Sequence, residues 1–440
     1  MSEADDRSPF ADLLDGADSV AAPSGRAGRI VMIVFLVMVL TVLAGGGGYV
    51  WWASAAPVGP PTLTSYSPSV PAGSPAAIRL PTSGSTLVSV EGGETYLGPD
   101  AAGSWVSSGG DDPRPIASIT KLITALVVLD AHPLDGADDP GPTIAFTEAD
   151  TDLYDRYYVL GATIARMPDG TKLSLHDALA TMLLPSASNY ATAVARWAYG
   201  SEAAFVDAAR SWLSANGLTS TRIVDATGID DRNTSTPTDL VALGKIASAN
   251  PTIARIAATT SINLPGGPGT VTNTNDLLGT EGVTGLKTGN LGEGSFNLLF
   301  TSDLDVGIGS PLHITGVRLG GATHDSTDQD VARLLQSIRD GFHKIPVGNV
   351  GTEIGKITTP WGAGAKVVVG QNASILTWSD TAVTTTVDTT TPEAYADGEK
   401  VGTITWTAGP NTASADVTIS GEIEEPTLWW RLTHPTELGG

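Results

Sequence analysis

The sequence contains no cysteine among its 440 residues. This absence excludes disulfides, thiol catalysis and Cys-ligated zinc sites in this chain. It also contains only six histidines and no H-E-x-x-H arrangement, which argues against a familiar metallopeptidase. The chemistry of the chain therefore has to come from other side chains.

Basic residues are scarce, with 24 Lys and Arg against 47 Asp and Glu and a formal net charge of −23. Binding of nucleic-acid phosphates needs clustered Lys and Arg, so we expect no nucleic-acid partner. Charged residues make up 16% and hydrophobic residues 41% of the chain, a balance typical of a globular protein. This length is enough for two or three domains and a sizeable core.

A single long apolar run, residues 30–52, has no charged residue in 23 positions, which is about the length that crosses a bilayer. Arg26 and Arg29 precede it and the next basic residue is Arg79. The positive-inside rule then predicts a cytoplasmic tail at 1–29, a transmembrane helix at 30–52 and an extracellular remainder. The alternative is a cleaved signal peptide, because Ala53-Ser54-Ala55 resembles a cleavage site. We favour a retained anchor, since the run is full length and the charged segment before it is long.

The rest of the chain divides by composition. Residues 53–77, rich in Pro, Ser and Ala, predict an extended linker. Strand-like runs at 85–90 and 93–98 come next, with two glycines near the turn between them. Helical patterns and then strand patterns follow, with helices predicted at 119–129, 175–184, 189–200, 202–215, 237–248 and 329–342, and strands at 282–289, 295–302 and 313–321.

This order of elements predicts an α+β domain over residues 78–345, with an antiparallel sheet and a segregated helical cluster. Short β-branched runs separated by Gly, Pro, Asn and Asp predict a small all-β domain at 346–440.

The helical segment 119–129 opens on Ser118-Ile119-Thr120-Lys121, whose spacing places the serine and the lysine on one face. Taken alone, S-x-x-K is a common helix start with a solvent-facing lysine. This lysine, however, lies in a run too apolar for a surface position, and a buried lysine is costly unless neutral or paired. A neutral amine beside a hydroxyl is a general base beside a nucleophile, which predicts these roles for Lys121 and Ser118.

Two further stretches are ambiguous on their own. Ser186, in "LLPSASNYA", lies between two predicted helices and by itself indicates only a helix end and a restart with Ser or Asn capping. Lys287-Thr288-Gly289 lies on a predicted strand that could simply end in a turn. Such a strand can also bind an extended peptide along its edge, with the Lys and Thr side chains holding a terminal carboxylate.

Together, and in this order, the three motifs resemble the S-x-x-K, S-x-N and K-T-G triplet of penicillin-recognising serine enzymes. Ser186 follows Ser118 by 68 residues, and Lys287 follows Ser186 by 101. Both gaps, and stretches such as "PIASITKLITALVVLD" and "VTGLKTG", are similar to the low-molecular-mass D-alanyl-D-alanine carboxypeptidases of the S11 serine peptidase type. The resemblance covers about residues 78–345 and, less specifically, the trailing β domain. It implies a penicillin-binding, β-lactamase-like transpeptidase fold.

The resemblance also implies an activity, namely removal of the terminal D-Ala from peptidoglycan stem peptides through an acyl-enzyme. Ser118 would attack the carbonyl of the penultimate D-Ala, Lys121 would accept its proton, and Ser186 would relay a proton to the leaving amine. β-Lactams would acylate the same serine, and no cofactor or metal is implied.

Substrate binding would fall to the third motif. Lys287 and Thr288 would hold the substrate carboxylate, with Gly289 beside them. The backbone N–H groups of Ser118 and Asn290 would form the oxyanion hole.

One position departs from the family pattern, because Ser188 stands where the family has Asn. The nearest asparagine, Asn189, lies one residue further along the chain. Either Ser188 supplies part of the missing contact to the substrate, or Asn189 rotates into the site, so both are expected substrate-binding residues. We expect an active enzyme, since the nucleophile, the base and K-T-G are intact.

Other functions are less well supported. A class A β-lactamase needs a Glu in an E-x-x-L-N pattern between the second and third motifs, and only Glu202 and Glu281 lie between 190 and 287. Carboxypeptidase–endopeptidases with a long insertion between the first two motifs do not fit the 68-residue gap. A serine esterase would show a Tyr motif second, and Tyr190 is not in that position. The remaining alternative is a catalytically degenerate, membrane-tethered peptidoglycan-binding or scaffold protein, for which Ser188 is the best support.

Overall fold

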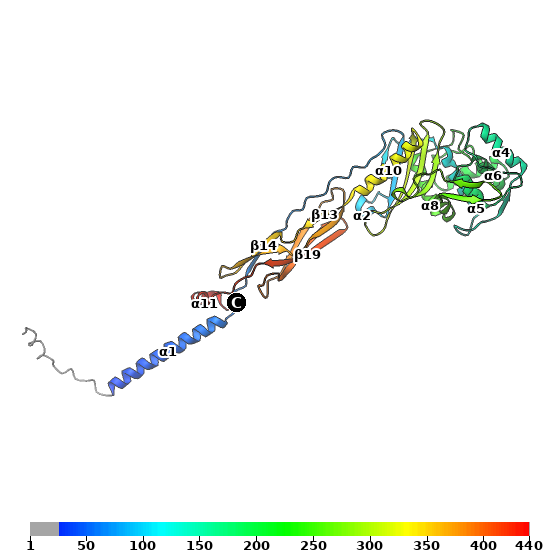
Figure 1. The fold of residues 1–440 in the computed structure, drawn as a ribbon. Helices are drawn as coiled ribbons and strands as arrows, with labels where there is room; N and C mark the ends of the chain where they lie inside the picture. The colour runs from blue at the N-terminus through cyan, green and yellow to red at the C-terminus, as the bar shows by residue number, and fades with distance from the viewer. Residues whose placement is uncertain (1–25, 440) are drawn as a thin grey trace, which may run out of the picture.

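The protein has an elongated shape in the computed structural model, which describes residues 26–439 (Figure 1). The helix α1 (Ala27–Ala55) lies at one end, a domain of mixed helices and strands lies at the other, and an all-β domain lies between them. The chain leaves α1, passes along the β domain, builds the mixed domain and returns to end beside α1. Most of the predicted cytoplasmic tail, residues 1–25, lies outside the described residues.

The mixed domain is built on a five-stranded antiparallel sheet in the order β10-β11-β12-β2-β3. Its strands are β2 (Ser85–Glu91), β3 (Val106–Ser108), β10 (Val283–Gly289), β11 (Phe296–Leu304) and β12 (Leu312–Gly321). Its helices are α2 (Glu94–Leu97), α3 (Thr120–Ala131), α4 (Glu148–Val159), α5 (Leu175–Leu183), α6 (Ser188–Tyr199), α7 (Glu202–Ala215), α8 (Pro237–Ala249), α9 (Pro251–Ala257) and α10 (His324–Asp340). Short paired strands complete it, namely β4 (Arg114–Pro115) with β7 (Thr234–Ser235), β5 (Thr143–Ala145) with β6 (Lys172–Ser174), and β8 (Ser261–Leu264) with β9 (Gly269–Thr272).

The two faces of this sheet bury different cores. On one face, Leu87, Leu299 and Val317 pack into the large apolar core of the helical cluster, which includes α3 and α8. On the other face, residues such as Val88 and Phe300 pack against α10. Successive side chains along each strand point alternately into the two cores, as expected for a sheet that is covered on both faces. The predicted α+β architecture is confirmed.

The predicted helix at 119–129 becomes α3, preceded by one 3₁₀ turn at Ala117–Ile119. Its apolar side chains are buried from Leu122 to Leu129 because they fill the helical core. Ser174 caps α5 by accepting a hydrogen bond from the Asp177 backbone N–H, as its position in the sequence predicts. One prediction is wrong: residues 93–98 do not form a strand, because Glu94–Leu97 forms the short helix α2.

The all-β domain contains a six-stranded antiparallel sheet in the order β1-β14-β15-β19-β18-β17 and a two-stranded pair, β13 with β16. Its strands are β1 (Thr62–Ser65), β13 (Phe342–Gly348), β14 (Glu353–Thr358), β15 (Gly364–Val369), β16 (Ala373–Trp378), β17 (Thr384–Thr389), β18 (Lys400–Ala408) and β19 (Asn411–Ser420). A separate apolar core, centred on the fully buried Trp406, holds it together.

The segment 53–77, predicted as an extended linker, contains some regular secondary structure. Residues 53–55 continue α1, and Thr62–Ser65 forms β1, an edge strand paired with β14. Edge pairing of this kind satisfies the backbone of the segment and also covers the edge of β14. The segment is therefore part of the β domain along these residues.

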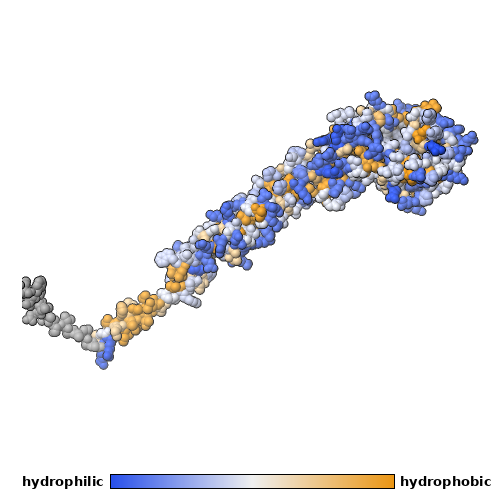
Figure 2. Space-filling model, in the orientation of Figure 1, coloured by the Kyte–Doolittle hydropathy of each residue, from blue (hydrophilic) through white to orange (hydrophobic). Residues whose placement is uncertain are grey.

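The base of the molecule joins the two ends of the described chain. Figure 2 shows α1 as an apolar cylinder that projects from an otherwise mixed surface. The short helix α11 (Leu428–Thr433) packs beside its last turn, followed by a 3₁₀ turn at Pro435–Glu437. The Arg431 guanidinium donates hydrogen bonds to the carbonyls of Ala53 and Ala56, and the Tyr49 hydroxyl donates to the Leu432 carbonyl. These contacts connect α1 to the β domain.

Candidate active site

The Ser118 turn lies where three segments of the mixed domain meet. Ala117, the residue before Ser118, has a positive φ of 50°, a conformation that L-residues adopt only where the surrounding structure enforces it. A Cβ on Gly289 would lie 2.8 Å from the Ile116 carbonyl oxygen, and one on Gly228 would collide with the Ala117 carbonyl. The glycines therefore allow β10 and the 225–230 loop to pack directly on the turn.

Lys121 lies directly beneath the hydroxyl of Ser118. Its Nζ lies 2.8 Å from Ser118 Oγ and 2.8 Å from the carbonyl oxygen of Thr227, and the side chain is fully buried. Burial lowers the pKa of the Lys121 ammonium from 10.5 to about 7, and the charge of Asp225 opposes part of this shift. At neutral pH a large share of Lys121 is therefore a neutral amine that can accept the Ser118 proton.

The loop that holds Lys121 is organised by Asp225. The carboxylate of Asp225 accepts hydrogen bonds from the backbone N–H groups of Thr227, Gly228 and Asp230 and from the Thr227 hydroxyl. These bonds fix the carbonyl of Thr227 that accepts from Lys121. Asp225 was not predicted as a site residue, although its side chain folds back on the following backbone N–H groups in the manner typical of Asx turns.

The second motif lies between α5 and α6. Ser186 is buried and has a positive φ of 65°, so the turn is held in a conformation that costs free energy for a residue other than Gly. Ser188 is the first residue of α6, and its backbone N–H donates to the Thr163 carbonyl.

Asn189 does not face the site, which corrects the expectation that it could rotate in. Its amide makes two hydrogen bonds to the backbone of Ala165, one accepted from the N–H at 3.1 Å and one donated to the carbonyl at 2.8 Å. Successive residues of an α-helix point about 100° apart, and here Ser188 lines the cleft while the Asn189 amide points to Ala165. Ser188 takes the position facing the cleft, and Asn189 holds the 162–166 segment.

The third motif lies on β10, the edge strand nearest the Ser118 turn. The Thr288 hydroxyl lies 2.6 Å from the hydroxyl of Thr274, a residue that the sequence did not single out. Lys287 is buried, and its Nζ donates to the Thr288 carbonyl at 3.1 Å. Burial, together with the charge of Lys121, holds the pKa of Lys287 well below its ordinary value. The side chain of Asn290 accepts a hydrogen bond from the Gly292 N–H at 2.6 Å.

These segments line one cleft of about 390 Å³. Six of the nine predicted site residues line it: Ser118, Ser186, Ser188, Thr288, Gly289 and Asn290. Lys121 and Lys287 lie buried behind these residues. The cleft is also lined by residues that sequence reasoning missed, among them Thr274, Asp276, Phe296 and His324. The structure thus brings all three motifs to one cavity with a hydroxyl and a near-neutral amine at its floor.

Comparison with known families agrees with this arrangement. The family model of peptidase S11, D-alanyl-D-alanine carboxypeptidase, matches residues 106–305. That range contains the Ser118 turn, the Ser186 turn and β10. This domain belongs to the S11 family.

The similar proteins are D-alanyl-D-alanine endopeptidases and carboxypeptidases by name. The D-alanyl-D-alanine endopeptidases of Haemophilus influenzae and Pseudomonas aeruginosa are 31% and 34% identical over 198 and 183 residues, which is 44% and 41% of this chain. The D-alanyl-D-alanine carboxypeptidase DacD of Salmonella typhimurium is 24% identical over 264 residues, or 58% of this chain. The aligned segments span 64%, 52% and 65% of these three relatives, so the chain spans less than two thirds of their length.

Solved structures support the fold. Penicillin binding protein 5 from Haemophilus influenzae has a TM-score of 0.51 at 19% identity, covering 80% of this chain and all of that one. Penicillin binding protein 6B from Escherichia coli has the same TM-score at 19% identity, covering 79% of this chain and 95% of that one. The predicted penicillin-binding fold, followed by a sheet-rich domain, is confirmed.

Within this S11 domain, the glutamates considered for a β-lactamase lie elsewhere. Glu202 begins α7 and lies 3.8 Å from the guanidinium of Arg196. Glu281 pairs with Arg339 of α10 at 2.6 Å. Neither lines the cleft among the residues that the structure describes. The β-lactamase alternative therefore has no Glu in place to activate a deacylating water.

Proposed function

We propose that this protein is a membrane-anchored serine D-Ala-D-Ala carboxypeptidase that removes the terminal D-Ala from peptidoglycan stem peptides. One observation carries the proposal: the fully buried Lys121, with a pKa of about 7, contacts the Ser118 hydroxyl at 2.8 Å. A hydroxyl beside a neutral amine is an activated nucleophile, and a scaffold binder would have no need to bury a lysine in this way.

The reaction follows from the positions of the side chains. Lys121 takes the proton as Ser118 Oγ attacks the carbonyl carbon of the penultimate D-Ala. The N–H groups of Ser118 and Asn290 stabilise the oxyanion, a contribution of roughly 3–4 kcal/mol to the barrier per donor. Ser186 passes its hydroxyl proton to the departing amine of D-Ala and regains the proton that Lys121 accepted, and water then hydrolyses the ester. The carboxylate of the leaving D-Ala lies against Thr288, with the N–H donors of Lys287 behind it.

At position 188, the wall of the cleft carries a serine hydroxyl where the family pattern has the longer side-chain amide of Asn. Ser188 can still donate to the acyl-side carbonyl of the stem peptide, but it cannot accept and donate at once over the same reach as Asn. We therefore expect weaker substrate binding with an intact chemical step. β-Lactams place their own carboxylate and carbonyl in the same positions, so they acylate Ser118 too.

A second candidate activity is cleavage of the D-Ala cross-link between stem peptides. The relatives with identities of 31% and 34% are named D-alanyl-D-alanine endopeptidases. Both activities use one acylation step and differ in the group that leaves, a free D-Ala or a cross-linked amine. We favour the carboxypeptidase because the relative that aligns over 58% of the chain is named for that activity.

The proposed site of action is the outer face of the cell membrane. The apolar helix α1 has the length and composition to cross a bilayer. The exposed tryptophans Trp51 of α1 and Trp429 of α11 lie on the two helices that meet at the base of the β domain. Tryptophan is favoured at membrane–water interfaces. We propose that α11 rests at the outer interface and that the β domain holds the cleft away from the bilayer.

The test uses the full-length protein in detergent, with three substrates. D-Alanine release is measured from a peptide ending in Lys-D-Ala-D-Ala, cleavage is measured on a cross-linked stem-peptide dimer, and acylation is measured with a fluorescent penicillin. Ser118→Ala is the control and is expected to abolish all three. Cleavage of the dimer alone would favour the endopeptidase, and a folded protein that is not acylated would favour the degenerate binder.

A further inference from the structure

Three potential metal ligands gather at the mouth of the active-site cleft. Asp276, His324 and Asp328 each offer one ligand atom, and these atoms lie within 4.8 Å of one another. His324 Nε2 lies 3.2 Å from Asp276 Oδ2 and 3.5 Å from Asp328 Oδ2. Asp276 and His324 also line the cleft with Ser118 and Thr288. The cluster is therefore open to the space where substrate binds.

Within this cluster, the carboxylate of Asp328 has one oxygen without a hydrogen-bond partner among the described residues. The residue is only 9% exposed, and its Oδ1 is buried without a hydrogen-bond partner in the described chain. A buried carboxylate with an unsatisfied oxygen is costly unless a cation or a proton compensates it.

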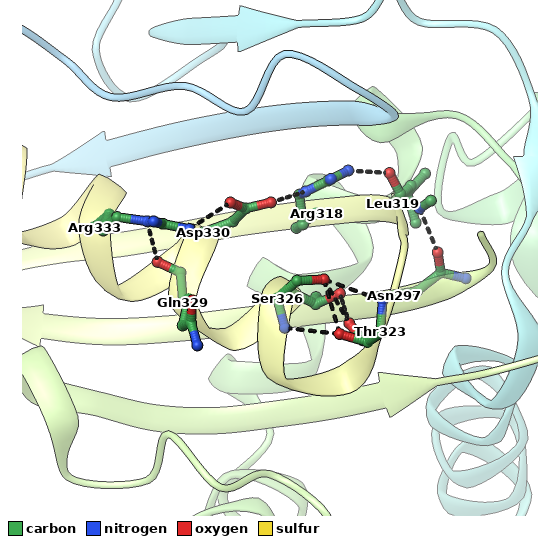
Figure 3. Close-up of polar contacts among 10 residues, drawn as sticks. Asn297, Arg318, Leu319, Thr323, Ser326, Gln329, Asp330 and Arg333 are labelled. Atoms are coloured by element: carbon green, nitrogen blue, oxygen red, sulfur yellow. Dashed lines mark hydrogen bonds and ion pairs between the residues drawn. The ribbon is translucent and has the colours of Figure 1, made fainter. Parts of the chain in front are cut away.

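The element that carries His324 and Asp328 is held firmly. Thr323 and Ser326 form a reciprocal capping box at the start of α10. The Arg318 guanidinium on β12 donates to Asp330 of α10 and to the Leu319 carbonyl, as Figure 3 shows. These contacts fix the first turns of α10 against the sheet.

The element that carries Asp276 is held as well. The Asn275 side chain accepts from the Leu277 N–H at 3.1 Å, and the Asn275 N–H donates to the side chain of Asn273 at 2.9 Å. Thr274 in the same loop contacts Thr288 of β10. All three ligands therefore lie on backbone whose position is set by other contacts, which a metal site requires.

We propose that Asp276, His324 and Asp328 bind a divalent cation of the zinc class at the mouth of the cleft. One imidazole nitrogen and two carboxylate oxygens make a three-ligand set that zinc accepts, with a further position left for water or substrate. The cation supplies the charge that the buried carboxylate of Asp328 lacks.

The proposed site has a consequence for the reaction, and this consequence rests on the proposed carboxypeptidase function. Substrate enters with a negatively charged terminal carboxylate, and Asp276 and Asp328 repel that charge. A bound divalent cation offsets both aspartates and lowers the KM for the anionic peptide. The cation takes no part in acylation, because Ser118 and Lys121 already form the nucleophile and its base.

Binding is tested first, without any activity assay. Zn²⁺ is titrated into the chelator-treated full-length protein, with calorimetry and thermal unfolding as readouts. We expect one site and a rise in Tm. His324→Gln and Asp276→Asn change exposed or half-exposed side chains, so they keep the fold and are expected to lose at least tenfold in affinity. The matched control is His313→Gln. His313 Nδ1 lies 2.7 Å from Asp303 Oδ1, and among the residues that the structure describes this exposed pair belongs to no group of three potential ligands.

The outcomes separate the two proposals. The metal site would be overturned, even in an active carboxypeptidase, if Zn²⁺ gave no heat of binding and no change in Tm. Equal Zn²⁺ affinity in wild type and His324→Gln would overturn it as well. Stoichiometric binding that His324→Gln abolishes supports the site even if no D-alanine is released. In the active protein, Zn²⁺ is expected to lower KM several-fold and to leave kcat unchanged.

Discussion

The pKa of Lys121 gives the sharpest quantitative test of the site. Burial lowers it from 10.5 to about 7. At an ordinary pKa, only about one lysine in three thousand would be neutral at pH 7, whereas at the lowered value about half are. The shift therefore raises the population of competent base about a thousandfold at neutral pH.

The assay is the second-order rate constant for acylation of Ser118 by a chromogenic penicillin, measured from pH 5 to pH 10. This constant reports ionisations of the free enzyme. It is expected to rise about tenfold per pH unit below 7 and to level off above it. At pH 5 it should be about one hundredth of its plateau. A rate that still climbs tenfold per unit at pH 9 would refute the reasoning, because Lys121 would then have an ordinary pKa.

The second buried amine, Lys287, has to be separated from the first, because interacting amines titrate as a pair. Lys287→Gln removes it and is expected to slow acylation through loss of the carboxylate contact. A midpoint near pH 7 that survives in this variant belongs to Lys121. Disappearance of the midpoint would assign it to Lys287 instead.

The same shift has a consequence for stability whose sign is definite. Because the pKa of Lys121 is lower in the folded state than in the unfolded one, the unfolded chain binds more protons between about pH 7 and pH 10.5. The free energy of unfolding then rises with pH across that window, by up to about 1.4 kcal/mol per unit for this group. Lys121→Met is expected to reduce that slope in urea titrations, and an unchanged slope would contradict the burial argument.

Three substitutions test other parts of the site. Gly289→Ala places a Cβ 2.8 Å from the Ile116 carbonyl oxygen, so acylation should fall about 100-fold, with about 1–3 kcal/mol of stability lost. Asn189→Ala removes two buried hydrogen bonds to Ala165 and should lower the free energy of unfolding by about 2–4 kcal/mol in urea titrations. Ser188→Ala should raise the KM of the stem peptide about tenfold and leave kcat nearly unchanged, as measured by D-alanine release.

Each of these has an outcome that counts against it. Normal acylation by Gly289→Ala would mean that β10 can move away from the Ser118 turn. Unchanged stability but lost activity in Asn189→Ala would mean that Asn189 does reach the substrate. An unchanged KM in Ser188→Ala would mean that this hydroxyl contributes nothing to binding.

Local sequence patterns were enough for most of the elements. The helices α5 to α8 and the strands β10 to β12 were predicted because their hydrophobic periods and caps are local properties. The strand predicted at 93–98 was wrong because the β-branched and aromatic residues in a stretch of six do not distinguish a strand from one turn of helix. The pairing of Thr62–Ser65 with β14 could not be predicted, since its partner lies almost 300 residues later in the chain.

By itself, the sequence determined the membrane-length helix, the α+β order and the three motifs, because these depend on residue type and short-range spacing. Only the tertiary structure decided whether Ser188 or Asn189 faces the cleft, since a step of one residue on α6 turns a side chain by about 100°. It also decided the pKa of Lys121, because desolvation of the amine depends on everything packed around it. The meeting of Asp276 with His324, 48 residues apart, is likewise a property of the folded chain alone.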